Sequence, residues 1–121
     1  MIADAELRAQ QRITDAFVRA DEISVELIRP FSMPDGAGGF VRGATETLSP
    51  QPFRLLPQED GATARTTADG ESATPEYMLL GRTGVDMARF DEFVIGERRY
   101  QIVYIDNRQY EVKGEVIYLG D

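Results

Sequence analysis

Apolar positions in the N-terminal segment recur with helical spacing. Good helix formers fill residues 5–11, and Asp4 has the short polar side chain that commonly caps the start of a helix. The apolar positions are Ala9, Ile13, Ala16, Phe17 and Ala20. This spacing predicts a helix over residues 2–20 with one thin, alanine-rich face. Such a face packs lightly on its own domain or docks on a partner, and the sequence leaves both open.

Alternation with a period of two predicts several strands in the first two thirds of the chain. Residues 23–28 alternate and predict a strand that ends at Pro30. Residues 40–48 predict a second, more polar strand that returns beside the first. Short strands are expected over residues 53–56 and over residues 76–81.

The C-terminal third has the clearest pattern. Gly96-Glu97 separates two alternating runs, and glycine at the first turn position predicts a two-residue type II′ hairpin. That register sets Phe93 opposite Tyr100. The residues expected to share the inner face of the hairpin are Phe93, Ile95, Tyr100, Ile102 and Tyr104. The final strand has an expected inner face at Tyr110, Val112, Gly114, Val116 and Tyr118, and a wet face at Glu111, Lys113 and Glu115.

Together these elements predict a mainly β fold, a small antiparallel β-barrel with long loops and an N-terminal α-helix. The length of 121 residues corresponds to one domain, with the helix over residues 1–21 and the barrel over residues 22–121. The residues expected to form most of the barrel core are Phe93, Ile95, Tyr100, Ile102, Val103, Val112 and Val116.

Two segments interrupt the strand pattern and are expected to be flexible excursions. Residues 32–43 are rich in turn formers. Residues 58–75 contain almost nothing apolar, so they cannot bury themselves and are expected to lack regular structure. A loop of that length in a small domain is usually functional or disordered.

Composition excludes several kinds of function. The formal net charge is −8, and the chain has no Cys and no His. Zinc sites with those ligands, and nucleophiles activated by histidine, are therefore impossible. The acidic balance argues against a protein that grips nucleic-acid phosphates. No apolar run approaches the roughly 20 residues of a membrane helix, and the charged N-terminus lacks the apolar core of a signal peptide, so we expect a soluble protein made in the cytoplasm.

Four acidic residues lie close together in the sequence near the C-terminal hairpin. Asp86, Asp91, Glu92 and Glu97 offer oxygen ligands of the kind that divalent cations prefer. Their spacing matches no EF-hand loop, and a solvated acidic turn before a strand is the simpler interpretation. We therefore expect no metal, no other cofactor and no catalytic residue.

Two further patterns have simpler structural interpretations. Gly36, Gly38 and Gly39 resemble part of a phosphate-binding loop, but no Lys-Ser/Thr pair and no helix start follows them. Tyrosines at positions 77, 100, 104, 110 and 118 could stack single-stranded nucleic acid. The negative charge and the β spacing favour places in the core and at the rim of the barrel instead.

A series of short motifs runs through the second half of the chain. They are residues 74–81 (TPEYMLLG), 84–87 (GVDM), 89–93 (RFDEF), 96–104 (GERRYQIVY) and 107–116 (NRQYEVKGEV), preceded by a strand with Arg29, the loop at 35–39 and FRLLP at 53–57. With them the chain resembles tailed-phage head closure proteins, also called head-to-tail stoppers or connectors, over residues 23–119. Phe90 stands where the family pattern has a glycine before the aspartate, and the N-terminal helix lies outside the matched part.

The resemblance implies a structural role in the virion. Such proteins form a homo-oligomeric ring between the portal-bound adaptor protein and the tail terminator or tail tube protein, and they retain packaged DNA. The small β-barrel makes the ring wall, and a long loop closes the channel. The chain would then belong to the head–tail neck, where double-stranded DNA passes without sequence-specific binding, and it would contact no membrane.

The two excursions are then expected to have separate roles. Residues 32–43 are the expected channel gate, because they are short, tethered between paired strands and rich in glycine hinges; the gate residues are Met33, Asp35, Gly36, Gly38, Gly39 and Phe40. Residues 58–75 are the expected docking arm on the adaptor or on neighbouring subunits, through Glu59, Asp60, Arg65, Asp69 and Glu71.

Two functions of other classes remain open from the residues alone. One is a small acidic β-barrel enzyme that uses Asp86, Asp91 and Glu92 with a divalent metal. The other is an OB-like module that binds a peptide or a single strand. A stopper would copurify with virions, whereas an enzyme would turn over as a small free species.

Overall fold

One helix precedes an antiparallel β-structure. The computed structural model describes residues 4–20, 22–34, 40–58 and 61–120. The elements are α1 (Asp4–Ala20), β1 (Ile23–Val25), β2 (Ile28–Pro34), β3 (Phe40–Thr47), β4 (Gln51–Pro57), β5 (Arg65–Thr66), β6 (Ser72–Ala73), β7 (Tyr77–Gly81), β8 (Glu92–Ile95), β9 (Arg98–Asn107) and β10 (Val112–Gly120). The predicted mainly β fold with an N-terminal helix is confirmed.

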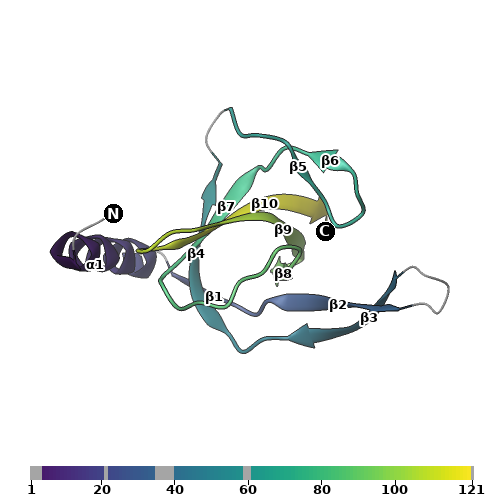
Figure 1. Cartoon of the computed structure of the whole chain (residues 1–121), viewed down its shortest axis with the longest axis horizontal. Coiled ribbons are helices and arrows are strands. Elements are labelled where there is room, and N and C mark those ends of the chain that lie inside the picture. Colours follow the sequence, from purple (N-terminus) through teal and green to yellow (C-terminus); the bar gives the residue numbers. More distant parts are fainter. Residues whose placement is uncertain (1–3, 21, 35–39, 59–60, 121) are drawn as a thin grey trace.

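Most of the strands belong to one curled sheet. Its order is β1-β4-β7-β10-β9-β8-β2-β3, and it wraps around the core (Figure 1). β5 and β6 form a separate two-stranded sheet. The expected barrel is not closed, because the described edge strands β1 and β3 are not paired with each other.

The gap in the barrel falls where β1 gives way to β2. β1 pairs with β4 through Ile23↔Phe53, whereas β2 pairs with β8 through Ile28↔Glu92. The chain therefore crosses between two sides of the curled sheet around Leu27. Leu27 is fully buried, and its carbonyl accepts a hydrogen bond of 2.8 Å from the amide of Leu48. The burial of Leu27 and this hydrogen bond hold the crossing segment in position, although β1 and β8 are not paired with each other.

The C-terminal hairpin has the predicted register. Ile95 pairs with Arg98 and Phe93 pairs with Tyr100, so the turn contains Gly96 and one further residue. Gly96 has a φ of 62°, the left-handed value that the first position of a type II′ turn requires. The Phe93 and Tyr100 rings stack with centroids 5.1 Å apart. Local turn chemistry was enough to predict this pairing.

The core lies inside the curl of the sheet. Its buried members are Val25, Leu27, Phe53, Leu79, Phe93, Tyr100, Ile102 and Val116. The residues predicted for the core are all buried except Ile95, which is half-buried beside the exposed hairpin turn. The core also contains Val25, Leu27, Phe53 and Leu79, which precede the C-terminal hairpins and were not among the residues predicted to form most of it.

Tyr104 does not lie on the inner face, and the prediction is wrong there. Across β9 and β10, Tyr104 pairs with Glu115 while Ile102 pairs with Val116, which leaves Val103 as an extra residue. A β-bulge of this kind shifts the alternation of side chains by one position. Tyr104 is consequently turned outward and is 39% exposed.

The last strand begins at Val112, later than the predicted inner-face residue Tyr110. Asn107 pairs with Val112, so Tyr110 lies in the turn, where the amide of Arg108 donates to the carbonyl of Glu111 at 2.9 Å. Farther along β10, Gly114 lies beneath Met87. A Cβ at position 114 would be 2.8 Å from the Met87 sulfur, so the Met87 side chain would have to shift to admit one.

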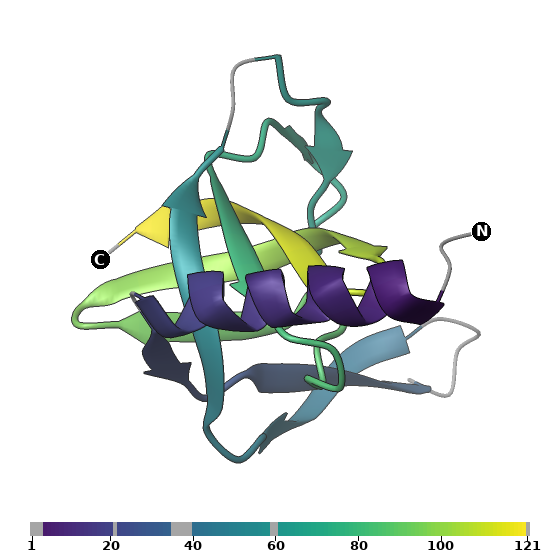
Figure 2. The ribbon, with the colours of Figure 1, turned by 90° about the vertical axis from the view of Figure 1, so that its left-hand side faces the viewer.

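Helix α1 lies outside the sheet, along one side of the molecule (Figure 2). The side-chain amide of Gln11 donates from Nε2 to the backbone carbonyl of Gln109 at 3.3 Å. Ile13, on the predicted apolar face, is 63% exposed. The side chains of Ala16, Phe17 and Ala20 lie outside the described part of the chain. No helix in the described residues is long and apolar enough to cross a membrane.

Candidate functional site

The β2–β3 ribbon projects from the body on the side away from α1 (Figure 1). The two strands pair from Ile28↔Thr47 to Pro34↔Phe40, with a register shift after Pro30. The predicted strand end at Pro30 is therefore wrong.

Hydrogen-bond alternation explains why the strand continues past the proline. The bond from Leu48 to Leu27 marks that pair as hydrogen-bonded. In an antiparallel ladder, bonded and non-bonded pairs alternate, so Pro30 opposite Thr45 falls at a non-bonded position. The missing proline N–H then breaks no bond between β2 and β3.

The predicted gate lies at the tip of this ribbon. Met33 lies near the end of β2 and Phe40 begins β3, although their side chains lie outside the described part of the structure. Asp35, Gly36, Gly38 and Gly39 lie outside the described residues altogether. Of the predicted gate, the structure describes the backbone of residues 32–34 and 40–43, where the two strands end and begin.

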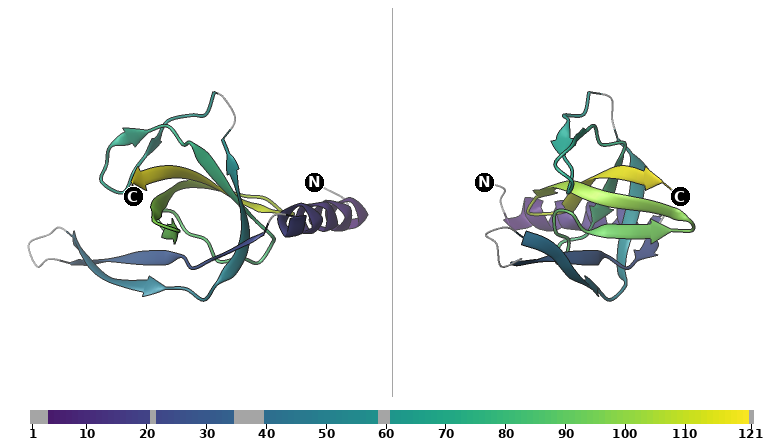
Figure 3. Two further views of the ribbon diagram at one scale, coloured as in Figure 1. Left: turned by 180° about the vertical axis from the view of Figure 1, so that it is seen from behind. Right: turned by 90° about the vertical axis from the view of Figure 1, so that its right-hand side faces the viewer.

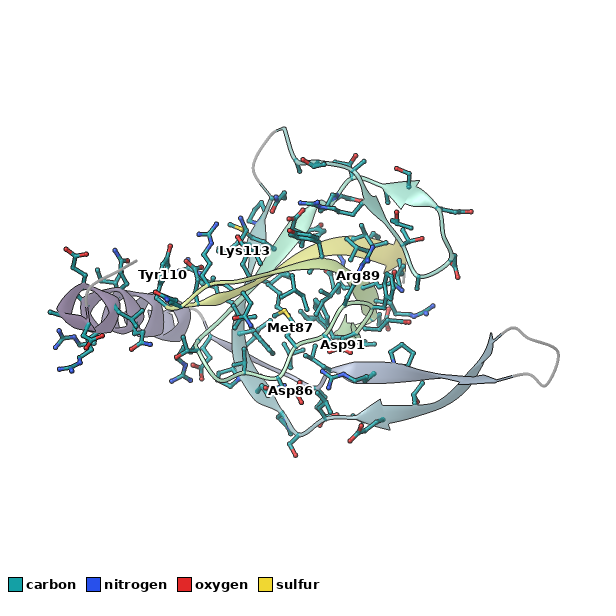
Figure 4. The ribbon with its side chains drawn as sticks, in the orientation of Figure 1. Asp86, Met87, Arg89, Asp91, Tyr110 and Lys113 are labelled. Carbon is teal, nitrogen blue, oxygen red and sulfur yellow. The ribbon has the colours of Figure 1, made fainter. Side chains whose placement is uncertain are left out.

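Arg29 fastens the base of the ribbon to the body. Its Nε donates to Asp91 Oδ1 at 3.0 Å, and its Nη2 donates to Asp91 Oδ2 at 2.8 Å and to Asp86 Oδ1 at 2.9 Å. Figure 4 shows Asp86 and Asp91 beside the start of β2. These hydrogen bonds, first to Asp91 and then to Asp86, raise the pKa of the Arg29 guanidinium.

A strained turn presents Asp91 to Arg29. Asp91 Oδ2 also accepts a bond of 2.8 Å from the amide of Ala88. Phe90 has a φ of 73°, a left-handed conformation that side chains other than glycine rarely adopt. The backbone on both sides is pinned to β9, because Phe90 donates to the carbonyl of Ile102 and the amide of Ile102 donates to Asp91. Phe90 is the position where the sequence departs from the glycine of the resembled family.

The acidic cluster is an ion-pair site, and the expected solvated turn is wrong for Asp91. The Asp91 carboxylate is fully buried, and both of its oxygens accept hydrogen bonds. Glu92 lies 3.6 Å from Arg99 instead, and Glu97 is exposed in the hairpin turn. In the ranges that the structure describes, no three Asp or Glu side chains are grouped to hold a metal ion. A magnesium site built on Asp86, Asp91 and Glu92 would have to displace Arg29.

Residues 61–75, called the arm below, contain regular structure that the sequence analysis did not predict. β5 and β6 pair through Arg65↔Ala73 and Thr66↔Ser72. The connecting turn is closed by a bond of 3.0 Å from the amide of Gly70 to the carbonyl of Thr67, and Gly70 has a φ of 86°. The Asp69-Gly70 dipeptide is a common hairpin signal and could have revealed the turn.

The arm folds over the outer face of β9 and β10. Arg65 donates from Nε and Nη2 to the two carboxylate oxygens of Glu115, at 3.2 and 3.1 Å, and its guanidinium lies 3.7 Å from the Tyr104 ring centre. The hydrogen bonds to Glu115 raise the pKa of Arg65. The amide of Ala68 donates to Gln101 Oε1 at 3.2 Å. Glu115 is therefore buried, although it was predicted for a wet face.

The predicted docking residues of the arm have different environments. Arg65 is bound to the chain's own sheet, whereas Asp69 and Glu71 are exposed. Glu59 and Asp60 lie outside the described residues. Figure 3 shows the arm and the β2–β3 ribbon as separate protrusions from the body.

The tyrosines do not form one stacking surface. At the inner side of the sheet, the ring centroid of Tyr100 lies 5.5 Å from that of Tyr77 and 5.7 Å from that of Tyr118. Tyr104 lies under Arg65 on the outer face, and Tyr110 lies in the β9–β10 turn. Their separation favours the packing role that the β spacing predicted.

No protein-family model matches the chain, and no curated protein matches it.

Proposed function

We propose that the chain is a head closure protein, a head-to-tail stopper in the neck of a tailed-phage virion. Copies would form a ring between the portal–adaptor complex and the tail and retain the packaged DNA. The β2–β3 ribbon is the observation that carries this proposal. It projects from the curled sheet (Figure 1), and in the sequence the glycine-rich segment of residues 35–39 joins its two strands.

The ribbon has the properties that a gate needs. Its base is held by the Ile28↔Glu92 bridge and by the contact of Arg29 with Asp91. A base held this way aims the described strands in one direction, and the sequence between them contains Gly36, Gly38 and Gly39. In a ring, every copy would present such a tip toward the channel. Residues 32–43 therefore serve as the gate in this proposal.

Charge supports passage of DNA through such a ring. The chain has a net charge of −8. An acidic channel repels phosphates, so double-stranded DNA slides through without binding by sequence. The partners in this proposal are other copies of the chain, the portal-bound adaptor protein and the tail terminator or tail tube protein. The role is structural and needs no catalytic residue.

Deletion of the tip tests the gate. We expect a phage whose protein lacks residues 35–39 to assemble necks whose tailless heads lose their DNA. The control deletion removes residues 67–70 from the arm, which leaves the ribbon intact. DNA retained per head is measured by nuclease protection, and neck occupancy by mass spectrometry of purified particles. If heads without residues 35–39 keep their DNA while heads without residues 67–70 lose it, the gate assignment is overturned. If the protein is not found in virions, the proposed function is overturned.

A further inference from the structure

The outer face of β9 and β10 carries a built binding site for a guanidinium group. Glu115 offers two carboxylate oxygens at 3.2 and 3.1 Å from Arg65, and the Tyr104 ring lies against the same guanidinium at 3.7 Å. A carboxylate fork combined with an aromatic face is the arrangement that binds arginine selectively. Beside it, the buried Gln101 side chain accepts the amide of Ala68.

The arm occupies this site through polar contacts. Its described bonds to the body come from the Arg65 side chain, the Ala68 amide and the Thr66 carbonyl, which accepts from Arg89 Nη2, in the loop before β8, at 3.3 Å. Among the described residues of the arm, Pro75 beside the anchored Glu76 is buried, and the apolar core cluster includes none of them. Lifting the arm would therefore leave the core packed. It would instead uncover Glu115 and Gln101, two polar side chains that need a replacement partner.

The connections of the arm allow it to leave as a unit. Its base is closed by bonds of 3.0 Å from the Gln58 amide to the Glu76 carbonyl and from the Glu76 amide to the Val116 carbonyl. These bonds tie Gln58 to Glu76 and Glu76 to β10, independently of what the tip of the arm contacts. Gly61, with a φ of 83°, lies at one end of the arm and has no side chain to restrict rotation.

We propose that neighbouring copies exchange arms, so that Arg65 of one copy binds the site formed by Glu115, Tyr104 and Gln101 of the next. The occupant is a second copy because the site already fits this arm, and exchange recreates the same contacts. The remaining cost is the entropy of association, which is small when copies are already held side by side. This proposal rests on the proposed ring only for that proximity, and its test needs no virion.

Charge reversal distinguishes exchange from a contact within one chain. Arg65→Glu and Glu115→Arg each place like charges against each other within a copy. In a mixture of the two variants, arm exchange restores an opposite-charge pair in both directions. We expect each variant alone to be monomeric in light scattering and the mixture to form a species of at least twice the monomer mass. A single variant that carries both Arg65→Gln and Glu115→Gln has lost both charges of the pair and should not associate.

Cysteine trapping gives a second readout, because the chain has no native cysteine. Ala68→Cys is added to the Arg65→Glu variant and Gln101→Cys to the Glu115→Arg variant. A covalent dimer linking the two variants on a non-reducing gel is the expected result. The control puts both cysteines in one chain with native charges, where the contact of Ala68 with Gln101 should give a disulfide within the monomer.

The proposal is overturned if the control chain forms its disulfide and the mixed variants form neither the covalent dimer nor the larger species. A negative result here, with DNA leaking from heads that lack residues 35–39, would leave the proposed neck function standing. A mixed dimer from a protein that is missing from virions would support the exchange and overturn the neck function.

Discussion

Arg29 and Asp91 lie 62 positions apart in the chain and form a two-point contact, with Nε and Nη2 of the arginine donating to the two carboxylate oxygens at 3.0 and 2.8 Å. The Asp91 side chain is fully buried, while that of Arg29 is 22% exposed. A buried carboxylate without a cation is costly, because it loses hydration and gains no partner in return. The contact therefore links the seating of the β2–β3 ribbon to the stability of the sheet.

Removing the cation should destabilise the protein strongly. We expect Arg29→Gln to lower the free energy of unfolding by roughly 3 kcal/mol, because it leaves Asp91 buried and unpaired. The matched control is Arg99→Gln. Arg99 is 56% exposed and 3.6 Å from Glu92, so its loss should cost at most about 1 kcal/mol. Urea denaturation measures both, and equal effects would contradict the assigned role of Arg29.

Glycine should be the best small residue at position 90. Phe90→Ala and Phe90→Gly both remove the ring, but only alanine retains the penalty for a φ of 73°. We therefore expect the glycine variant to be more stable than the alanine variant by about 1 kcal/mol. Thermal melts of the two variants test this, and the reverse order would show that the turn relaxes to a negative φ.

The core of the C-terminal hairpin should be sensitive to truncation. Ile102 is fully buried, and we expect Ile102→Ala to cost about 2–5 kcal/mol of unfolding free energy. Val94 is on the same hairpin but 51% exposed, so Val94→Ala should change the unfolding free energy little. A melting temperature that is unchanged by Ile102→Ala would refute the observed register.

Two buried glycines should tolerate a methyl group to different degrees. A Cβ at Gly81 would lie 2.8 Å from both the Phe53 ring and Val85 Cγ2. A Cβ at Gly114 would meet the Met87 sulfur at the same distance, and methionine is a flexible side chain that can move aside. We expect Gly81→Ala to cost about 1–3 kcal/mol and Gly114→Ala to cost less. Chemical denaturation of the pair decides the order.

Features set by neighbouring residues were predictable from the sequence. The Phe93–Tyr100 pairing follows from a two-residue turn, and the return of β3 beside β2 follows from one short excursion. The hairpin of the arm also had a local turn signal in Asp69-Gly70. The prediction missed it because the segment has almost no apolar residues and was expected to lack regular structure.

Features set by distant residues were not predictable. The pairing of Arg29 with Asp91 depends on the order of the strands, since β8 lies beside β2 only in the folded sheet. The bulge at Val103 reverses the facing of Tyr104, and nothing in the alternating sequence marks it. The burial of Glu115 depends on a cover supplied by residues 50 positions away.

The turn at Phe90 also has a mechanical consequence for the ribbon. Arg29 grips the side chain of Asp91, whose carbonyl accepts a bond of 2.8 Å from the amide of Ile102 in the centre of the sheet. A force applied to β2 is therefore transmitted to β9 through Asp91. It is also transmitted to β8 through the pairing of Ile28 with Glu92. The base of the ribbon is thus held at two points, and a load on β2 is shared between β8 and β9.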